Sequence, residues 1–153
     1  MPRADTITPT DANEAAVLGF FTNLMRKDMA AFAELWADDA VQDMPFAKGI
    51  EGLEPRWEGK ETILAYYNKA IPGRRDHVFE IDQFHRTKDP EVIIVEARGK
   101  STISETGRLY DQRYVFIFRL RDGKIMLNRE HFNPIVFQRA FDGFIVGQRK
   151  AEG

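Results

Sequence analysis

The hydrophobic pattern of this chain changes its period once, at Pro72-Gly73. Before that point apolar residues recur at helical spacing, and after it they alternate with polar residues as in half-buried strands. Turn sequences divide the alternating region at Lys88-Asp89-Pro90, Glu105-Thr106-Gly107 and Arg121-Asp122-Gly123. The last of these is typical of a tight β-hairpin. We therefore predict strands over about 77–86, 91–104, 108–121 and 124–133.

The first half of the chain predicts three helices. Asp11 and Glu14 have the spacing of a capping box ahead of an apolar stripe, and Asp28 is placed to cap a second helix. The elements expected here are, in order, a helix from Asp11 to the break at Lys27-Asp28, a shorter helix ending at Asp38-Asp39, a strand over 40–46, a loop over 47–57 and a helix over 59–70.

Helices followed by a run of hairpins predict an α+β fold, in which an antiparallel sheet carries its helices on one side. A sheet of such long strands must twist and curl. If it curls around the three N-terminal helices, it forms a cone whose open mouth leads to an apolar pocket. We expect one domain over 11–144, a loose N-terminal arm over 1–10 and a C-terminal tail over 145–153.

The charges argue against two classes of partner. The formal net charge is −2, from 22 basic and 24 acidic residues that are interspersed along the chain. We therefore expect neither nucleic-acid binding nor contact with a membrane. The absence of cysteine excludes disulfides and thiolate chemistry and suits a cytoplasmic protein. The N-terminus has no apolar core of a signal peptide, and no stretch is apolar enough to span a bilayer.

One carboxylate in the last predicted strand has an unusual setting. Strand alternation places Glu130 on the same face as Met126, Asn128 and Phe132. In an apolar pocket, Glu130 would have a raised pKa and would serve as a general base or acid. The alternatives are a cross-strand ion pair with Arg113 or Arg98, or a position on a solvated face.

Four short sequence segments follow one another in an order that is typical of a known family. They are Leu35-Trp36-Ala37-Asp38-Asp39-Ala40-Val41, Trp57-Glu58-Gly59-Lys60-Glu61, Tyr110-Asp111-Gln112-Arg113-Tyr114, and Asp122-Gly123-Lys124-Ile125 running into Arg129-Glu130-His131-Phe132-Asn133-Pro134. Together they resemble the SnoaL-like branch of the NTF2-like superfamily, which also contains ketosteroid isomerase. The resemblance covers about residues 12–142 and implies a cone-shaped fold. The last string is also similar to the PhzA/PhzB phenazine-biosynthesis proteins, and that similarity implies that Glu130 faces the pocket and handles protons.

The steroid-isomerase residues do not carry over to this chain. The tyrosine that binds the oxyanion in those enzymes matches Phe20, and their second oxyanion acid lines up near Val115 or Phe116. Their base is an Asp directly before a Pro, whereas here Met44 precedes Pro45 and Asp43 is one residue earlier, on the other face of a regular strand. The resemblance therefore implies the fold and leaves the reaction open.

Tyrosines are the next candidates. Tyr66 stands where the phenazine proteins have an assisting His, and we expect its phenol either to meet a developing oxyanion or to pack. Tyr110 and Tyr114 either contact a ligand or belong to ordinary sheet packing. Asp43 is expected to pair with Glu130, to act as the base itself, or to sit in a turn at the strand end. The predicted substrate-binding set is Phe20, Trp57, Tyr110, Tyr114, Asn128 and Phe132, with Trp57 as a lid.

No cofactor or metal is expected. His77 and His85 share strand parity but lie about 26 Å apart in an extended strand, and His131 points away from Glu130 by alternation. The chain has no Gly-rich phosphate loop, Ser-centred nucleophile elbow or zinc spacing.

The sequence thus predicts a cofactor-independent acid–base enzyme of isomerase, cyclase or lyase type. It would abstract a proton from a small hydrophobic, aromatic or polycyclic substrate, with Glu130, Tyr66 and Asp43 as its catalytic residues. We also predict a homodimer packed sheet to sheet. Two alternatives are a non-catalytic small-molecule carrier or accessory subunit, and an assembly protein whose pocket is filled by its own aromatic side chains.

Overall fold

A computed structural model describes residues 2–142, 144–145 and 148–149, with side chains for residues 2–142. The elements in chain order are η1 (Ala4–Thr6), α1 (Ala12–Arg26), α2 (Met29–Glu34), β1 (Trp36–Asp43), η2 (Pro45–Ala47), β2 (Arg56–Glu58), α3 (Lys60–Ala70), η3 (Ile71–Gly73), β3 (Arg74–Arg86), β4 (Val92–Ile103), β5 (Leu109–Arg121), β6 (Lys124–Phe132), α4 (Pro134–Phe141), β7 (Phe144–Ile145) and β8 (Gln148–Arg149). No helix in the described part of the chain is long and apolar enough to cross a membrane.

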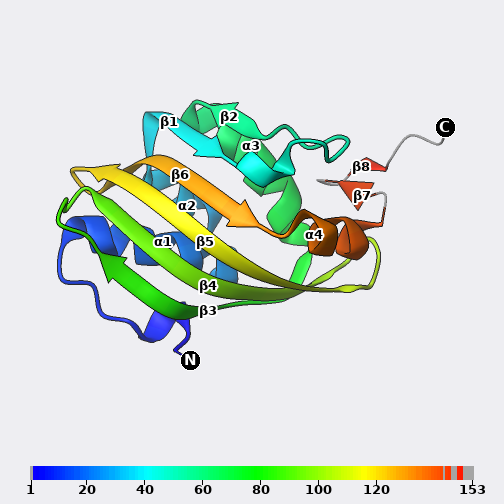
Figure 1. The fold of residues 1–153 in the computed structure, drawn as a ribbon, viewed down its shortest axis with the longest axis horizontal. Coiled ribbons are helices and arrows are strands. Elements are labelled where there is room, and N and C mark those ends of the chain that lie inside the picture. The colour runs from blue at the N-terminus through cyan, green and yellow to red at the C-terminus, as the bar shows by residue number, and fades with distance from the viewer. Residues whose placement is uncertain (1, 143, 146–147, 150–153) are drawn as a thin grey trace.

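One curved, unclosed sheet forms the body of the molecule, with α1, α2 and α3 against one face and α4 at one end (Figure 1). Its strand order is β2-β1-β6-β5-β4-β3. The predicted hairpin run from β3 to β6 is confirmed, and Asp122 and Gly123 both have the positive φ values, 51° and 73°, that a tight hairpin needs. The α+β class with a sheet curled around the N-terminal helices is therefore confirmed.

The prediction of a wholly antiparallel sheet is wrong at one pair of strands. β1 lies parallel to β6, with Gln42 opposite Asn128. No hairpin joins these two strands, and they lie far apart in the chain. Their relative direction is therefore set by packing and not by any turn that the sequence displays.

The second helix ends earlier than its sequence predicts. Asp28 caps α2 as expected, accepting a hydrogen bond from the Ala31 N–H at 3.0 Å. The helix stops at Glu34 and the strand starts at Trp36, so Asp38 and Asp39 lie within β1. The physical reason is a competing partner, because the Leu35 carbonyl accepts a 2.7 Å hydrogen bond from the N–H of Ile125 in β6.

The N-terminal segment is not the loose arm that the sequence predicts. The Pro2 carbonyl accepts a hydrogen bond from the Ile81 N–H at 2.9 Å, and Arg3 pairs with Glu80. Ala4 is fully buried beside them. These contacts extend the sheet beyond the edge strand β3, which protects that edge from other chains.

The segment that follows β6 is helical. It forms α4, which Asn133 caps by accepting hydrogen bonds from the N–H groups of Ile135 and Val136. The predicted tail over 145–153 falls largely outside the described residues, which include only β8 and Ile145 of that range.

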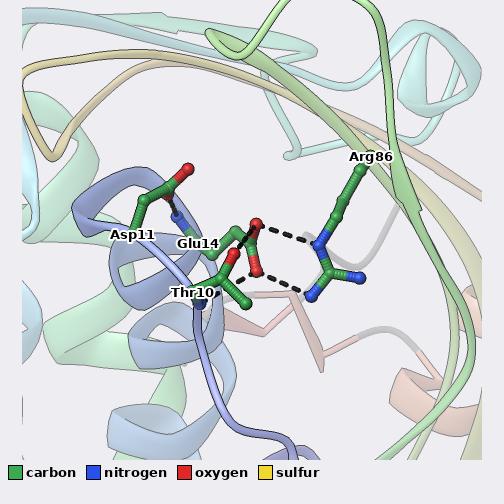
Figure 2. Close-up of polar contacts among 4 residues, drawn as sticks. All are labelled: Thr10, Asp11, Glu14 and Arg86. Atoms are coloured by element: carbon green, nitrogen blue, oxygen red, sulfur yellow. Dashed lines mark hydrogen bonds and ion pairs between the residues drawn. The ribbon is translucent and has the colours of Figure 1, made fainter.

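An ion pair between the buried Glu14 and the half-exposed Arg86 ties the start of α1 to the end of β3 (Figure 2). Asp11 caps the helix as predicted, accepting from the Glu14 N–H at 2.8 Å, but Glu14 does not complete a capping box. Its carboxylate accepts two hydrogen bonds from the Arg86 guanidinium, at 2.7 and 2.9 Å, and one from the Thr10 hydroxyl at 2.6 Å. The hydrogen bonds from Arg86 lower the pKa of Glu14 to about 2.

Replacing Glu14 by Gln is expected to lower the free energy of unfolding by about 2 kcal/mol at pH 7. The pKa shift alone corresponds to roughly 3 kcal/mol, which the solvent exposure of Arg86 reduces. Because the folded-state pKa lies below the unfolded value, this stability is fully present above pH 4.5 and is lost as the pH falls toward about 2. Urea denaturation of both proteins from pH 7 to pH 2.5 measures it. The exposed Glu34→Gln is the control, and a constant difference between E14Q and the wild type across this range would contradict the assignment.

Candidate active site

A pocket opens between the helices and the inner face of the sheet. The space free of protein atoms in this pocket, open solvent at its mouth included, is about 510 Å³. Its walls come from α1, α3, η3 and α4 and from strands β1, β3, β5 and β6. The lining residues are Phe20, Leu24, Gln42, Met44, Leu53, Tyr66, Tyr67, Ala70, Ile71, Arg74, His77, Phe79, Tyr110, Tyr114, Glu130, Phe132 and Phe137.

Glu130 is the one carboxylic acid in this lining. It projects inward from β6, opposite Phe116 of β5, on the face that strand alternation predicts. Among the described residues, no hydrogen bond or ion pair reaches its carboxyl group. Burial raises the pKa of Glu130 to about 7, and the nearby positive charge of Arg74 partly offsets that rise. Glu130 therefore changes its protonation state near neutral pH.

The alternative roles for Glu130 find no support in the structure. Arg98 instead forms a bidentate pair with Asp111, at 2.6 and 2.8 Å. Arg113 contacts Asp82 at 3.5 Å. Both arginines lie on the outer face of the sheet, so neither is available to neutralise an inward-facing carboxylate.

All four tyrosines of the chain line the pocket. Burial raises the pKa of each phenol, and that of Tyr110 reaches about 12. These hydroxyls therefore stay protonated over the whole range in which Glu130 titrates. The Tyr110 hydroxyl accepts a 3.2 Å hydrogen bond from Gln112. The four phenols give the pocket several O–H donors on aromatic walls.

The structure brings several predicted site residues together. Glu130, Tyr66, Phe20, Tyr110, Tyr114 and Phe132 all contribute to the lining of this one pocket. They come from α1, α3, β5 and β6, which are separated in the sequence and converge only because the sheet curls around the helices.

Three predicted residues lie outside that lining. Asp43 faces the other side of β1, where its carboxylate accepts a 2.9 Å hydrogen bond from Arg129. Trp57 is buried against Tyr66, with ring centroids 3.9 Å apart, and so lies behind a pocket wall and not across the mouth. Asn128 is buried behind Gln42, to whose side-chain oxygen it donates at 2.9 Å.

Two residues of the pocket, the cationic Arg74 and the polar His77, are absent from the site predicted from the sequence. Regular alternation along β3 places residues 74 and 77 on opposite faces. Asp76 adopts a left-handed conformation with φ of 52°, and the pairing with β4 shifts between Arg75 and Val78. This bulge turns Arg74 inward, onto the face that His77 shares with Phe79, and nothing in the local sequence marks it in advance.

His77 lines the pocket, a position that its spacing from His85 in the sequence does not predict. Burial, followed by the nearby charges of Arg74 and Lys27, lowers its pKa to about 3, so the imidazole is neutral. Its Nδ1 is buried without a hydrogen-bond partner among the described residues. His85 instead pairs with Glu96 at 2.6 Å, and His131 lies on the outer face beside Phe46. Within the described residues no three acidic or imidazole side chains are grouped to hold a metal ion.

The arrangement suits proton transfer. A carboxyl group with a pKa near 7 can both take and return a proton near neutrality. Protonated phenols beside it can donate to an oxygen on which negative charge develops. The aromatic side chains in the walls lower the polarity around the carboxyl group, which strengthens such interactions.

Comparison with known proteins gives a consistent family assignment. Residues 17–128 match the SnoaL-like domain family. The chain is 35% identical over 126 residues to the uncharacterized protein YesE of Bacillus subtilis, covering 81% of this chain and 83% of YesE. It is 30% identical over 126 residues to the uncharacterized PhzA/B-like protein PA3332 of Pseudomonas aeruginosa, covering 82% of this chain and 87% of that protein.

Solved structures share the fold over most of their length. A putative isomerase from Bacillus subtilis superposes with a TM-score of 0.79 at 29% identity, covering 95% of this chain and 100% of that one. The Δ5-3-ketosteroid isomerase of Mycobacterium sp. gives 0.72 at 21% identity, covering 83% and 97%. RV0760c from Mycobacterium tuberculosis, in complex with estradiol-17beta-hemisuccinate, gives 0.72 at 19% identity, covering 83% and 98%. The last two show a common fold alone.

Proposed function

The chain belongs to the SnoaL-like domain family, and on that premise we propose that it is a cofactor-independent enzyme working by general acid–base catalysis. The proposed reaction removes a proton from a small hydrophobic molecule, aromatic or polycyclic, and leads to isomerisation, cyclisation or elimination. One observation carries the proposal. The Glu130 carboxyl, with a pKa of about 7, lies in an aromatic pocket without an ion-pair partner among the described residues.

Glu130 is proposed as the group that moves the proton. Its raised pKa makes it a stronger base than an ordinary carboxylate while leaving about half of it ionised at neutral pH. Acid–base catalysis of this kind contributes about 10²–10⁴-fold, so the pocket must also stabilise the charge left on the substrate.

Tyr66 and Tyr114 are proposed to stabilise that charge. Both phenols line the pocket and remain protonated while Glu130 titrates. A donor that is already oriented before the reaction needs no reorganisation when negative charge develops on an oxygen. Asn128, which does not line the pocket, would act only by orienting Gln42. Asp43 is tied to Arg129 on the outer face, so we leave it out of the mechanism.

The pocket walls support a hydrophobic, ring-containing substrate. Phe20, Phe79, Phe132 and Phe137 present aromatic surface to the cavity together with the four phenols. Rings stack or meet edge to face on such walls, which gives orientation as well as apolar burial.

The same pocket residues bear on the two alternatives to an enzyme, a carrier and an assembly protein. A non-catalytic carrier needs no carboxyl group that titrates near neutrality, and a Glu130 neutralised by arginine would have favoured it. An assembly protein filled by its own side chains is less well supported, because a pocket is present beside Phe20, Tyr66 and Phe132. RV0760c, which shares the fold, binds a steroid derivative, so the carrier remains the second candidate.

The pH dependence of proton exchange tests the proposal. With 2-tetralone and 1-indanone as carbon-acid probes in D₂O, we expect enzyme-dependent deuterium incorporation, followed by proton NMR. The rate should rise about tenfold per pH unit below the Glu130 pKa of about 7 and level off above it, because the base acts only when deprotonated.

Titration of the Glu130 carboxyl by ¹³C NMR provides an independent measurement. A carboxyl that titrates near its ordinary value, together with no exchange above the buffer rate, would favour the carrier. A rate that falls as pH rises through 7 would instead make Glu130 the acid.

The sheet-to-sheet homodimer also stays a proposal. In the described part of the chain, the outer face of β4 and β5 carries the exposed Val115 and the ion pairs Arg98–Asp111 and Arg113–Asp82. A second copy packed on this face would cover Val115 and surround these pairs with protein. Pairing of such sheets would leave the pocket of each copy on the opposite side.

A further inference from the structure

Arg74 reaches the pocket because the chain contains one extra residue at that point. η3 ends at Gly73, and β3 begins at once with Arg74. Phe79 and Ile81 continue the inward face of the strand, so regular alternation would turn Arg74 outward and Arg75 inward. The bulge at Asp76 reverses this order. Arg74 is 8% exposed, whereas Arg75 and Asp76 are exposed to solvent.

The guanidinium of Arg74 has no polar partner in the described part of the chain. No carboxylate lies within ion-pair distance of it, and none of its N–H groups makes a hydrogen bond there. Its planar group instead lies 5.2 Å from the ring centroids of Tyr110 and Phe141. These rings hold the guanidinium plane and attract its charge, but they do not satisfy its fork of N–H donors.

A buried charge without a partner is costly, so an arginine in this position is a candidate for pairing with a ligand. Glu130 is the one acid lining the pocket, and it makes no ion pair with Arg74. The nearby His77 is neutral, with its buried Nδ1 unpartnered. The pocket therefore offers a planar cationic fork and an imidazole at one side, and a separate proton-transfer group on β6.

We propose that Arg74 is an anion-binding residue and that the ligand of this pocket is a small planar ring compound carrying a carboxylate. An arginine fork matches the two oxygens of a carboxylate, and the aromatic walls match the ring. Binding the acid group at Arg74 orients the ring and directs the remainder of the molecule toward Glu130. This assignment adds a substrate class to the proposed function. It rests on that function only in so far as Glu130 would act on the bound ring.

The carboxylate preference is tested by binding alone, with 2-naphthoate and its neutral analogue 2-naphthamide as probes. Isothermal titration at pH 6 is expected to show that the wild type binds the carboxylate at least about 10-fold more tightly, as a charge-assisted hydrogen bond would give. Arg74→Gln should bring the two dissociation constants together. Arg75→Gln, which removes the adjacent exposed arginine, should leave the preference unchanged.

A third variant separates recognition from folding. Arg74→Lys keeps the charge but loses the bidentate fork, so a reduced preference for the carboxylate is expected. If circular dichroism shows that Arg74→Gln does not fold, the comparison of the wild type with Arg74→Lys tests the carboxylate preference. Equal binding of both probes by the wild type, binding of neither, or a preference that survives intact in either Arg74 variant would overturn the proposal.

The two proposals fail differently. A carboxylate preference that depends on Arg74, without any proton exchange, would remove the acid–base enzyme and leave Arg74 as the anion site of a carrier. Proton exchange on neutral ketones without a carboxylate preference would keep Glu130 as the base and remove the role of Arg74.

Discussion

Replacing Glu130 by Gln is expected to reduce the rate of enzyme-dependent proton exchange by about 10²–10⁴-fold, the usual contribution of a positioned acid–base group. Gln has nearly the same shape as Glu but cannot take a proton, so the pocket is preserved while the base is lost. The measurement is deuterium incorporation into 2-tetralone at pH 8, where Glu130 is mostly ionised in the wild type. In E130Q, the pH–rate profile of deuterium exchange should show no plateau above pH 7.

The same substitution is expected to stabilise the protein at high pH. The pKa of Glu130 in the folded state lies above its unfolded value of 4.5, so the contribution of Glu130 to stability is most favourable below pH 4.5 and is lost as the pH rises through about 7. Glu130→Gln removes that penalty and should raise the free energy of unfolding by about 2 kcal/mol at pH 8. The exposed Glu61→Gln serves as the control for both measurements. Unchanged exchange in E130Q would remove Glu130 from the mechanism, and a loss of stability at pH 8 would indicate a structural role instead.

Replacing Phe20 by Ala is expected to lower the free energy of unfolding by about 3–5 kcal/mol. Phe20 is 1% exposed and occupies the centre of the aromatic core. Its ring centroid lies within 6.2 Å of those of Phe21, Phe32, Trp36, Tyr67, Phe116 and Phe118. Truncation leaves a cavity that α1 cannot close, because rings from α2, α3 and β5 hold its sides apart.

Phe46→Ala is the matched control for this prediction. The same side chain is removed, but Phe46 is 56% exposed and its ring meets the His131 ring at 5.5 Å, so a change within about 0.5 kcal/mol is expected. Urea denaturation curves of both variants measure the difference. Comparable losses from the two substitutions would contradict the placement of Phe20 at the centre of the core.

Local rules succeeded where one segment decides its own structure. The positive φ values at Asp122 and Gly123 follow from a turn that only a few residue types tolerate. The inward position of Glu130 follows from the period of an uninterrupted strand, which has no irregularity between Asn128 and Phe132 in its pairing with β5. The Asp11 and Asp28 caps follow from the spacing of an acceptor and a free N–H.

The same rules failed where a distant partner competed with the local preference. α2 ended early because Ile125 of β6 captures the Leu35 carbonyl. The Glu14 carboxylate does not complete the expected capping box, because it accepts two charged hydrogen bonds from Arg86, 72 positions away in the sequence. The parallel pairing of β1 and β6 places Asp43 opposite Arg129, which donates a hydrogen bond to it. No turn in the sequence predicts this pairing.

The sequence by itself determined the order of helices and hairpins, the family resemblance and the face on which Glu130 lies, because periodicity, caps and tight turns are properties of neighbouring residues. The tertiary structure alone decided that four tyrosines, Arg74 and His77 share one pocket with that acid. Curling of the sheet brings β3 and β6 to opposite walls of the same cavity, and one left-handed residue in β3 turns a cation inward. Both depend on contacts between segments that are far apart in the chain, and such contacts leave no mark in a local pattern.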